Sequence, residues 1–264
     1  LAGCKGSEFG KQAFLDCEML QRVELPEGLT VIGDGAFGEC HSLIRIELPE
    51  KLTTVGDKAF YMCESLDDVE LPEGLTTIGD GAFSGCLSLS SVELPEGLTT
   101  IGDRAFLGCD SLRSIKLPGS LTAIGDRAFY ECSSLSSIEL PEGLTTIGNE
   151  AFIGCSSLRS IKLPAQLTNL APGAFRLCER LEAFSVAPNH SVYTTIDGIL
   201  YEKATQTLIA YPEGRGATTL IVPEGIRAIG NYAFADCSSL SSIELPGSLT
   251  AIGYSAFSWC SSLS

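Results

Sequence analysis

Apolar and polar positions along this chain repeat with a period of 23 residues. The segment LPEGLTTIGDGAFSGCLSLSSVE, from Leu71 to Glu93, is a typical unit. Eight of its positions are apolar or small, and we expect their side chains to face inward: Leu71, Leu75, Ile78, Ala82, Phe83, Cys86, Leu89 and Val92. A fixed period of this length is typical of a solenoid built from stacked copies of one unit.

Cysteine and phenylalanine fix the register of the repeat. A phenylalanine lies three residues before each cysteine of one column, so the chain holds about ten copies and one longer unit. The column consists of Cys17, Cys40, Cys63, Cys86, Cys109, Cys132, Cys155, Cys178, Cys237 and Cys260. One unit buries too few apolar side chains to offset the entropy of ordering it, whereas stacked units cover each other's open faces.

Each unit predicts one short strand and one short turn or helix. Leu89, Val92 and Leu94 alternate with polar residues, as in a strand with one buried face, and Pro95 ends the strand. After Gly79, we expect Asp80 to cap the amides of a brief helical turn. That turn would place the alanine, phenylalanine and cysteine of the unit on one side.

Between Cys178 and Cys237 the spacing is 59 residues, one normal unit of 23 plus one unit expanded to 36 residues, over about 186–221. Residues 198–201 and 208–211 are strand-like and flank a polar turn, which predicts a β-hairpin projecting from the solenoid. Tyrosine and arginine, residue types favoured at binding hot spots, gather here with a histidine: His190, Tyr193, Tyr201, Tyr211 and Arg215. Two interpretations stay open, namely packing of the hairpin on the solenoid and a partner-binding surface.

The unit LxxIxLPxxLTxIGxxAFxxCxSL resembles the BspA-like leucine-rich repeats of bacterial surface proteins. The resemblance covers residues 9–264 as a single domain, because the copies share the LP, IG and AFxxC steps together. It implies an α/β repeat solenoid, a right-handed superhelix with a parallel β-sheet on the concave side and short helices or turns on the convex side. It also implies adhesion to a host extracellular or neighbouring-cell protein, from a cell-surface or secreted position with a lipid or wall anchor.

The charge balance narrows the possible partners. The formal net charge is −16, from 33 acidic and 17 basic residues, so nucleic acid is not expected as a partner. No apolar run reaches the ~18 residues of a membrane span. Four glutamates at outward strand positions would stack as neighbours: Glu24, Glu47, Glu70 and Glu93. They predict recognition of a basic partner, with a merely solvated face and calcium bridging as alternatives.

The residues needed for catalysis or metal binding do not converge in the sequence. The two histidines, His41 and His190, are about six units apart, and the serines repeat without a base beside them. The cysteine column places one thiol in each unit, whereas zinc needs about four ligands at one point. We therefore expect no enzyme activity, no metal and no cofactor. Buried free thiols are the expected state, with disulfides between units as the alternative.

The first eight residues predict no fold. Residues 1–4, LAGC, match a lipobox whose cysteine would carry lipid, or else residues 1–8 are an irregular start or a segment from cloning. The function predicted for residues 9–264 is a non-enzymatic protein-binding scaffold for adhesion. The alternative is a structural spacer or stalk, or an engineered array, because several outward segments recur nearly verbatim.

Overall fold

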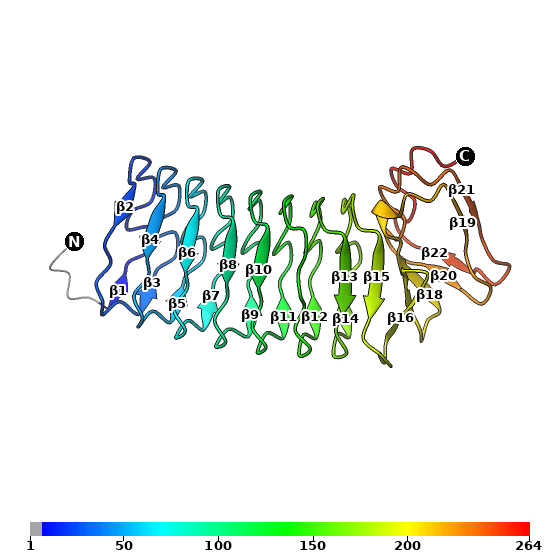
Figure 1. Cartoon of the computed structure of the whole chain (residues 1–264), viewed down its shortest axis with the longest axis horizontal. Helices are drawn as coiled ribbons and strands as arrows, with labels where there is room; N and C mark the ends of the chain where they lie inside the picture. The colour runs from blue at the N-terminus through cyan, green and yellow to red at the C-terminus, as the bar shows by residue number, and fades with distance from the viewer. Residues whose placement is uncertain (1–6) are drawn as a thin grey trace.

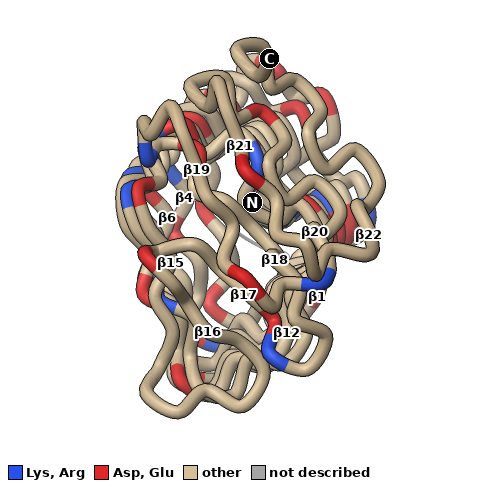
Figure 2. Tube along the Cα trace, turned by 90° about the vertical axis from the view of Figure 1, so that its right-hand side faces the viewer, with Lys and Arg blue, Asp and Glu red and all other residues tan. Residues whose placement is uncertain are grey.

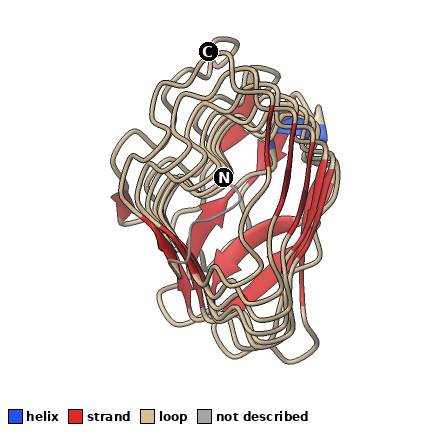
Figure 3. Cartoon of the chain, turned by 90° about the vertical axis from the view of Figure 1, so that its left-hand side faces the viewer, coloured by secondary structure: helices blue, strands red, loops and turns tan. Residues whose placement is uncertain are grey.

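The computed structural model describes residues 7–264. The chain winds into coils that stack along one axis, with the first and last described strands at opposite ends of the stack (Figure 1). Seen along this axis, the coils superimpose and carry strands on two of their sides (Figure 3). The lipobox prediction for residues 1–4 lies outside the described residues.

One side of the stack is the long-strand ladder, formed by the LxxIxL segments. Its strands pair in parallel with a shift of one unit, as Ile46 does with Val69. This confirms the predicted parallel strands. The strands are β2 (Arg22–Val23), β4 (Arg45–Glu47), β6 (Asp68–Glu70), β8 (Ser91–Glu93), β10 (Ser114–Lys116), β13 (Ser160–Leu163), β15 (Ala183–Val186), β19 (Thr219–Ile221) and β21 (Ser242–Glu244).

A second side is the short-strand ladder, which the sequence analysis did not predict. The TTI segments pair in parallel here, and Thr76 Oγ1 donates to the carbonyl of Thr53 in the preceding coil at 3.2 Å. The threonine pairs therefore support a second strand in most units. The strands are β1 (Glu8–Phe9), β3 (Val31–Ile32), β5 (Thr54–Val55), β7 (Thr77–Ile78), β9 (Thr100–Ile101), β11 (Ala123–Ile124), β12 (Thr146–Ile147), β14 (Asn169–Leu170), β20 (Ala228–Ile229) and β22 (Ala251–Ile252).

The third side, formed by the AFxxC segments, is the turn side. Of the two expected forms, short helices and turns, the structure shows turns; within residues 7–264 the one helical element is the 3₁₀ turn η1 (Glu213–Arg215). The amide of Ala36 bonds to Gly33 in its own coil at 3.1 Å, but that of Phe37 bonds to Ala59 of the next coil at 2.8 Å. An α-helix needs successive amides to stay within one segment, so this alternation excludes it.

Rings and thiols form two files inside the stack. Eight phenylalanine rings, from Phe14 to Phe175, stack nearly parallel, with centroids 5.1 to 5.6 Å apart. Beside them, Cys109 Sγ donates to the carbonyl of Phe83 at 3.2 Å, a bond that recurs along the column. The thiols are free, as predicted, and burial raises the pKa of Cys109 to about 12.

The aspartate after each IG step links its coil to the next coil, and the prediction that it caps its own turn is wrong. Asp80 Oδ1 accepts the backbone amide of Asp103 at 2.9 Å. The same bond recurs along most of the column. A Cβ on Gly102 would lie 2.8 Å from Asp80 Oδ1, so the glycine leaves room for the carboxylate.

The expanded unit forms three antiparallel strands within the wall of the solenoid. They are β16 (Tyr193–Ile196), β17 (Ile199–Glu202) and β18 (Thr207–Ala210). β18 pairs in parallel with β20, so these strands continue the short-strand ladder in one five-stranded sheet. The predicted hairpin insertion that projects from the solenoid is therefore not supported. The extra residues are packed into the stack.

Strand β17 divides the interior into two hydrophobic cores. Leu200 packs into the core of the preceding coils, whereas Ile199 and Tyr201 pack into the core of the following coils. The ring file breaks at the same place, because Phe175 meets Phe184 edge-on at 5.4 Å. In Figure 1 the coils after β16 are turned relative to the coils before it.

Candidate binding surface

The long-strand ladder carries a strip of exposed glutamates along its first coils. In each strand an inward valine or isoleucine precedes an outward glutamate, and the LPE step adds a second exposed glutamate three residues later. Two columns of carboxylates result, with one member of each in each of the first four coils. We call these eight residues the acidic strip: Glu24, Glu27, Glu47, Glu50, Glu70, Glu73, Glu93 and Glu96.

The register of the strands places like charges side by side. Glu47 lies directly opposite Glu70, and like charges at this distance destabilise a sheet. At the C-terminal end of the strip the next coil places Lys116 opposite Glu93. The two side chains form an ion pair, which raises the pKa of Lys116. Of the eight carboxylates of the strip, that of Glu93 is therefore the one in an ion pair within residues 7–264.

Two shallow hollows along the strip combine carboxylates with an apolar floor. One, of about 550 Å³, lies over Leu48 and Pro49, between Glu27 and Glu50, and Lys51 lines its edge. The second, of about 350 Å³, lies over residues 68–73 and 91–95. Lysine and arginine bury an aliphatic stem while their charged end stays in water, so such hollows suit basic side chains. Figure 2 shows how the positions of Lys, Arg, Asp and Glu are distributed along the coils.

The second predicted group of binding residues lies mostly in the core. Only 2% of His190, 4% of Tyr193, 2% of Tyr201 and 7% of Tyr211 is exposed to solvent. These four side chains cannot contact a partner in this conformation. Their placement corrects the interpretation of a binding surface and agrees with the packing alternative. Arg215 is half-buried and donates to the carbonyl of Asp197, which joins η1 to the turn between β16 and β17.

His190 and Tyr193 hold the expanded unit in place. The Nδ1 atom of His190 accepts the amides of Val192 and Tyr193, both at 3.2 Å, and burial lowers the pKa of His190. The hydroxyl of Tyr193 donates to the carbonyl of Thr168 at 3.3 Å and accepts the amide of Leu170 at 3.2 Å. The strand β16 is thereby fixed to the preceding coil.

Tyr211 occupies the phenylalanine position of the expanded unit. Its ring lies 5.3 Å from that of Phe234, and its amide bonds to Ala233 as the phenylalanine amides do in other coils. The sequence contains this signal, because Tyr211 precedes Phe234 by 23 residues. That spacing predicts a core residue, which the composition of the segment does not.

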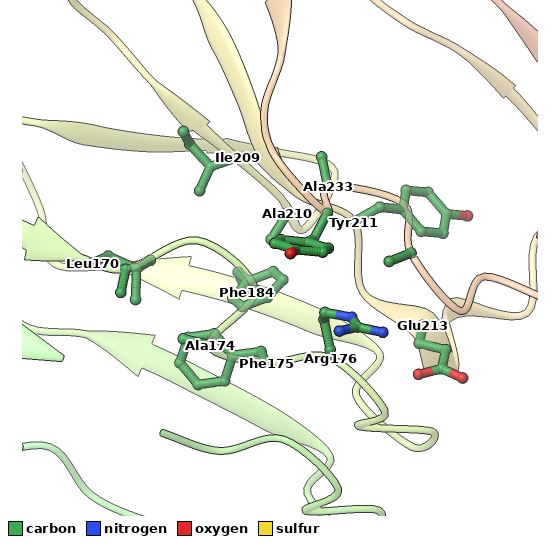
Figure 4. A pocket seen from close by; sticks show the side chains of 14 residues that line it. Leu170, Ala174, Phe175, Arg176, Phe184, Ile209, Ala210, Tyr211, Glu213 and Ala233 are labelled. Atoms are coloured by element: carbon green, nitrogen blue, oxygen red, sulfur yellow. The ribbon is translucent and has the colours of Figure 1, made fainter. Parts of the chain in front are cut away.

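A charged cluster at the junction of the two cores was not predicted. Arg176 donates to Asp236 Oδ2 from Nη2 at 2.9 Å and from Nε at 3.0 Å, and its guanidinium lies 5.0 Å from the Tyr232 ring. Glu213 lies on the same side of the junction as Arg176 (Figure 4), and its Oε2 is buried without a hydrogen-bond partner. No sequence signal joins these residues, because Arg176 and Asp236 are 60 positions apart.

Burial raises the pKa of Glu213 to about 7. Repulsion from the carboxylates of Asp236 and Glu179 acts in the same direction, while Arg176 partly opposes it. The protonation of this carboxyl therefore changes near neutral pH.

Within residues 7–264, no three histidine, cysteine, aspartate or glutamate side chains are grouped so that they could hold a metal ion. No helix in this range has the length and apolar character needed to cross a bilayer.

The repeat is matched by the family model for the BspA type leucine rich repeat region, in six copies over residues 6–112, 76–205 and 210–264. The chain belongs to this family. Together with the parallel-strand solenoid, membership identifies the molecule as a repeat scaffold. No curated protein matches the chain.

Solved structures of bacterial proteins are similar to this BspA type chain. A leucine rich cell surface protein of Faecalibacterium prausnitzii A2-165 is 31% identical, with a TM-score of 0.70. A leucine-rich repeat protein of Bacteroides ovatus is 30% identical, with a TM-score of 0.68, and one of Eubacterium ventriosum is 27% identical, with a TM-score of 0.68. The alignments cover 97%, 97% and 74% of this chain and 63%, 68% and 52% of the other proteins.

Proposed function

We propose that this BspA type chain is a non-enzymatic protein-binding scaffold, on a bacterial cell surface or secreted, whose acidic strip binds a basic segment of a partner protein. The observation that carries this proposal is the strip itself, eight exposed carboxylates in two columns over an apolar floor. The partner class is a host extracellular protein or a protein of a neighbouring cell. Adhesion is the expected outcome of such binding.

The strip has the chemistry of a recognition surface more than of a stabilising feature. Stacked glutamates cost sheet stability, so their presence in four successive coils is not explained by folding. Complementary charge increases the rate of encounter with a basic partner, and the apolar floor adds contact area for the stems of lysine and arginine.

Surface localisation is supported by the 31% identical protein of Faecalibacterium prausnitzii, whose name describes it as a cell surface protein. Anchoring through lipid or the cell wall belongs to the same proposal. Export signals in the full reading frame would test it.

The second candidate function is a structural spacer without a specific ligand. The segment SSLSSIELP occurs at 133–141 and again, unchanged, at 238–246, so the outward strand positions of these coils are nearly uniform. A uniform serine surface offers little specificity. This observation concerns the middle and last coils and not the acidic strip.

The test compares three proteins for binding to immobilised poly-L-lysine and to a panel of purified extracellular-matrix and plasma proteins. The strip variant replaces the four strand glutamates by glutamine: Glu24, Glu47, Glu70 and Glu93. The matched control replaces four exposed or half-exposed glutamates elsewhere by glutamine: Glu131, Glu179, Glu202 and Glu224. Both variants lose four negative charges, so net charge alone cannot separate them.

We expect the wild-type and control proteins to bind in a salt-sensitive manner and the strip variant to lose most of the binding. Equal binding of the two variants would refute the strip as the contact surface. A wild-type protein that binds no member of the panel would favour the spacer.

A further inference from the structure

The turn side of the first five coils alternates between large and small residues at the positions that flank the inward phenylalanine. The coil of Phe60 carries Lys58, Tyr61 and Met62 at these positions, whereas the coil of Phe83 carries Gly81, Ser84 and Gly85. Large residues return in the coil of Phe106 with Arg104 and Leu107, and glycines occupy the coil of Phe37 at Gly35 and Gly38. On the turn side, coils with large residues therefore alternate with coils with small ones.

Two hollows result, separated by one ridge. The first, of about 600 Å³, lies over Gly35 and Gly38, and the second, of about 560 Å³, lies over Gly81 and Ser84. The coil of Phe60 supplies the wall between them, because Lys58 and Tyr61 line both hollows. The two hollows are thus two coils apart, which is ~9.6 Å at the usual spacing of strands.

The ridge and the second hollow combine apolar surface with free positive charge. Met62, Leu87 and Leu107 line this hollow, and Lys58 Nζ lies 5.8 Å from the Tyr61 ring centroid. Among the ion pairs of residues 7–264, none involves Lys58 or Arg104. Carboxylates line both hollows, with Asp34, Glu39 and Asp57 in the first and Asp110 and Glu131 in the second, and Asp34 is paired with Lys11. Lys58, on the ridge between the hollows, is the cation that an acidic residue of a ligand spanning both would meet.

The spacing of the hollows selects the conformation of a bound peptide. A polyproline II segment places every third residue on one side at intervals of ~9.3 Å, close to the two-coil distance. An extended strand places same-side residues ~6.7 or ~13.4 Å apart, so it cannot fill both hollows. In an α-helix, residues on the same face seven positions apart lie at intervals of ~10.5 Å, and the helix, with a diameter of ~10–12 Å, is wider than one coil.

We propose that this pair of hollows binds a polyproline II segment of a protein partner, with apolar side chains at positions three apart and an acidic residue between them. The first apolar side chain lies over Gly35 and Gly38, the second over Gly81 and Ser84, and the acidic residue meets Lys58 on the ridge. Aromatic and apolar grooves are a known mode of recognising such segments. The site lies on a different side of the coils from the acidic strip and does not depend on the function proposed for the strip.

The probe is a fluorescein-labelled peptide of sequence Pro-Pro-Leu-Pro-Glu-Leu-Pro-Pro, titrated with the 264-residue chain by fluorescence anisotropy. A peptide of the same composition, Pro-Pro-Leu-Glu-Leu-Pro-Pro-Pro, moves the leucines to positions two apart. A helical alanine-based peptide with leucines seven apart tests the competing conformation. We expect the first peptide to bind at least tenfold more tightly than either of the others.

The variant Ser84→Tyr is designed to fill the second hollow: Ser84 is only 6% exposed, and tyrosine occupies the same position in other coils at Tyr61 and Tyr130. We expect it to weaken binding of the first peptide at least tenfold. Ser84→Ala keeps the hollow open, and Ile153→Tyr adds the same ring at the same position outside the two hollows. Both controls are expected to bind as the wild-type chain does.

Lys58→Ala tests the charge on the ridge. The substitution is expected to weaken binding of the glutamate peptide severalfold. Binding of a peptide with glutamine in place of the glutamate should stay unchanged. The proposal is overturned if the wild-type chain binds none of the peptides at millimolar concentration, if leucine spacing has no effect, or if Ser84→Tyr binds normally. The strip variant is expected to bind this probe normally, so failure of one proposal leaves the other open.

Discussion

Glu213 makes the stability of the junction between the two cores depend on pH. Its carboxyl is partly buried, close to Asp236 and Glu179, and its pKa is raised from 4.5 to about 7. The folded chain therefore holds this proton more tightly than the unfolded chain does. The stabilisation is fully present below pH 4.5 and is lost as the pH rises to about 7.

The size of the effect follows from the shift. A full shift of this size corresponds to at most ~3.4 kcal/mol, at ~1.36 kcal/mol for each pKa unit. Because water reaches part of the side chain and screens its charge, we expect about 1–2 kcal/mol. For a chain of this size that difference moves the midpoint of thermal unfolding by about 2–8 °C.

The assay compares thermal unfolding of the wild-type chain and Glu213→Gln at several pH values between 5 and 8. Glutamine keeps the shape and removes the titration, so we expect the variant to be more stable than the wild type at pH 8 and similar to it at pH 5. Glu224→Gln, at an exposed position, controls for the loss of one charge. Parallel pH profiles for the wild type and Glu213→Gln would show that this carboxyl is not the source of the effect.

Three other predictions test the stack itself. Asp103→Ala removes a bond between coils and should lower the free energy of unfolding by about 1 kcal/mol, with Asp103→Asn recovering most of it in urea denaturation. Phe106→Ala should cost about 3–5 kcal/mol, and more than Phe257→Ala, because Phe106 stacks on two rings and Phe257 on one; equal costs would contradict the stacked file. In thiol labelling at pH 8, Cys17 should react at once, and Cys109 only after unfolding, since burial raises its pKa to about 12.

The inward-facing residues of each coil could be predicted from the sequence because their burial depends only on the 23-residue period of the repeat. Phe83, Cys86 and Leu89 recur at fixed intervals, and their burial follows from any stacking of equal units. The exposure of Glu47 and Glu70 follows in the same way, from alternation around one inward residue. These predictions needed no knowledge of hydrogen-bond partners.

Hydrogen bonding between coils could not be predicted in this way. A segment with a glycine, an aspartate and inward residues three apart looks like a capped helical turn. The hydrogen bonds cross to the next coil, where the amide of Phe37 donates to Ala59 and Asp80 accepts the amide of Asp103, and no pattern within one unit shows them. The aromatic composition around Tyr201 suggested a surface for a similar reason, because a strand buried on both faces has no counterpart in the regular units.

The position of β17 between the two cores has a consequence for how the chain can change in length. In a regular stack, only the two end coils leave an interior face uncovered. Losing or gaining a unit therefore changes which coil stands at an end. Here β17 and β18 together complete the packing on either side, since Leu200 and Ile209 pack with the preceding core and Tyr201 and Leu208 with the following one. Units can therefore be duplicated or deleted in one half while the interior of the other half keeps the same neighbours.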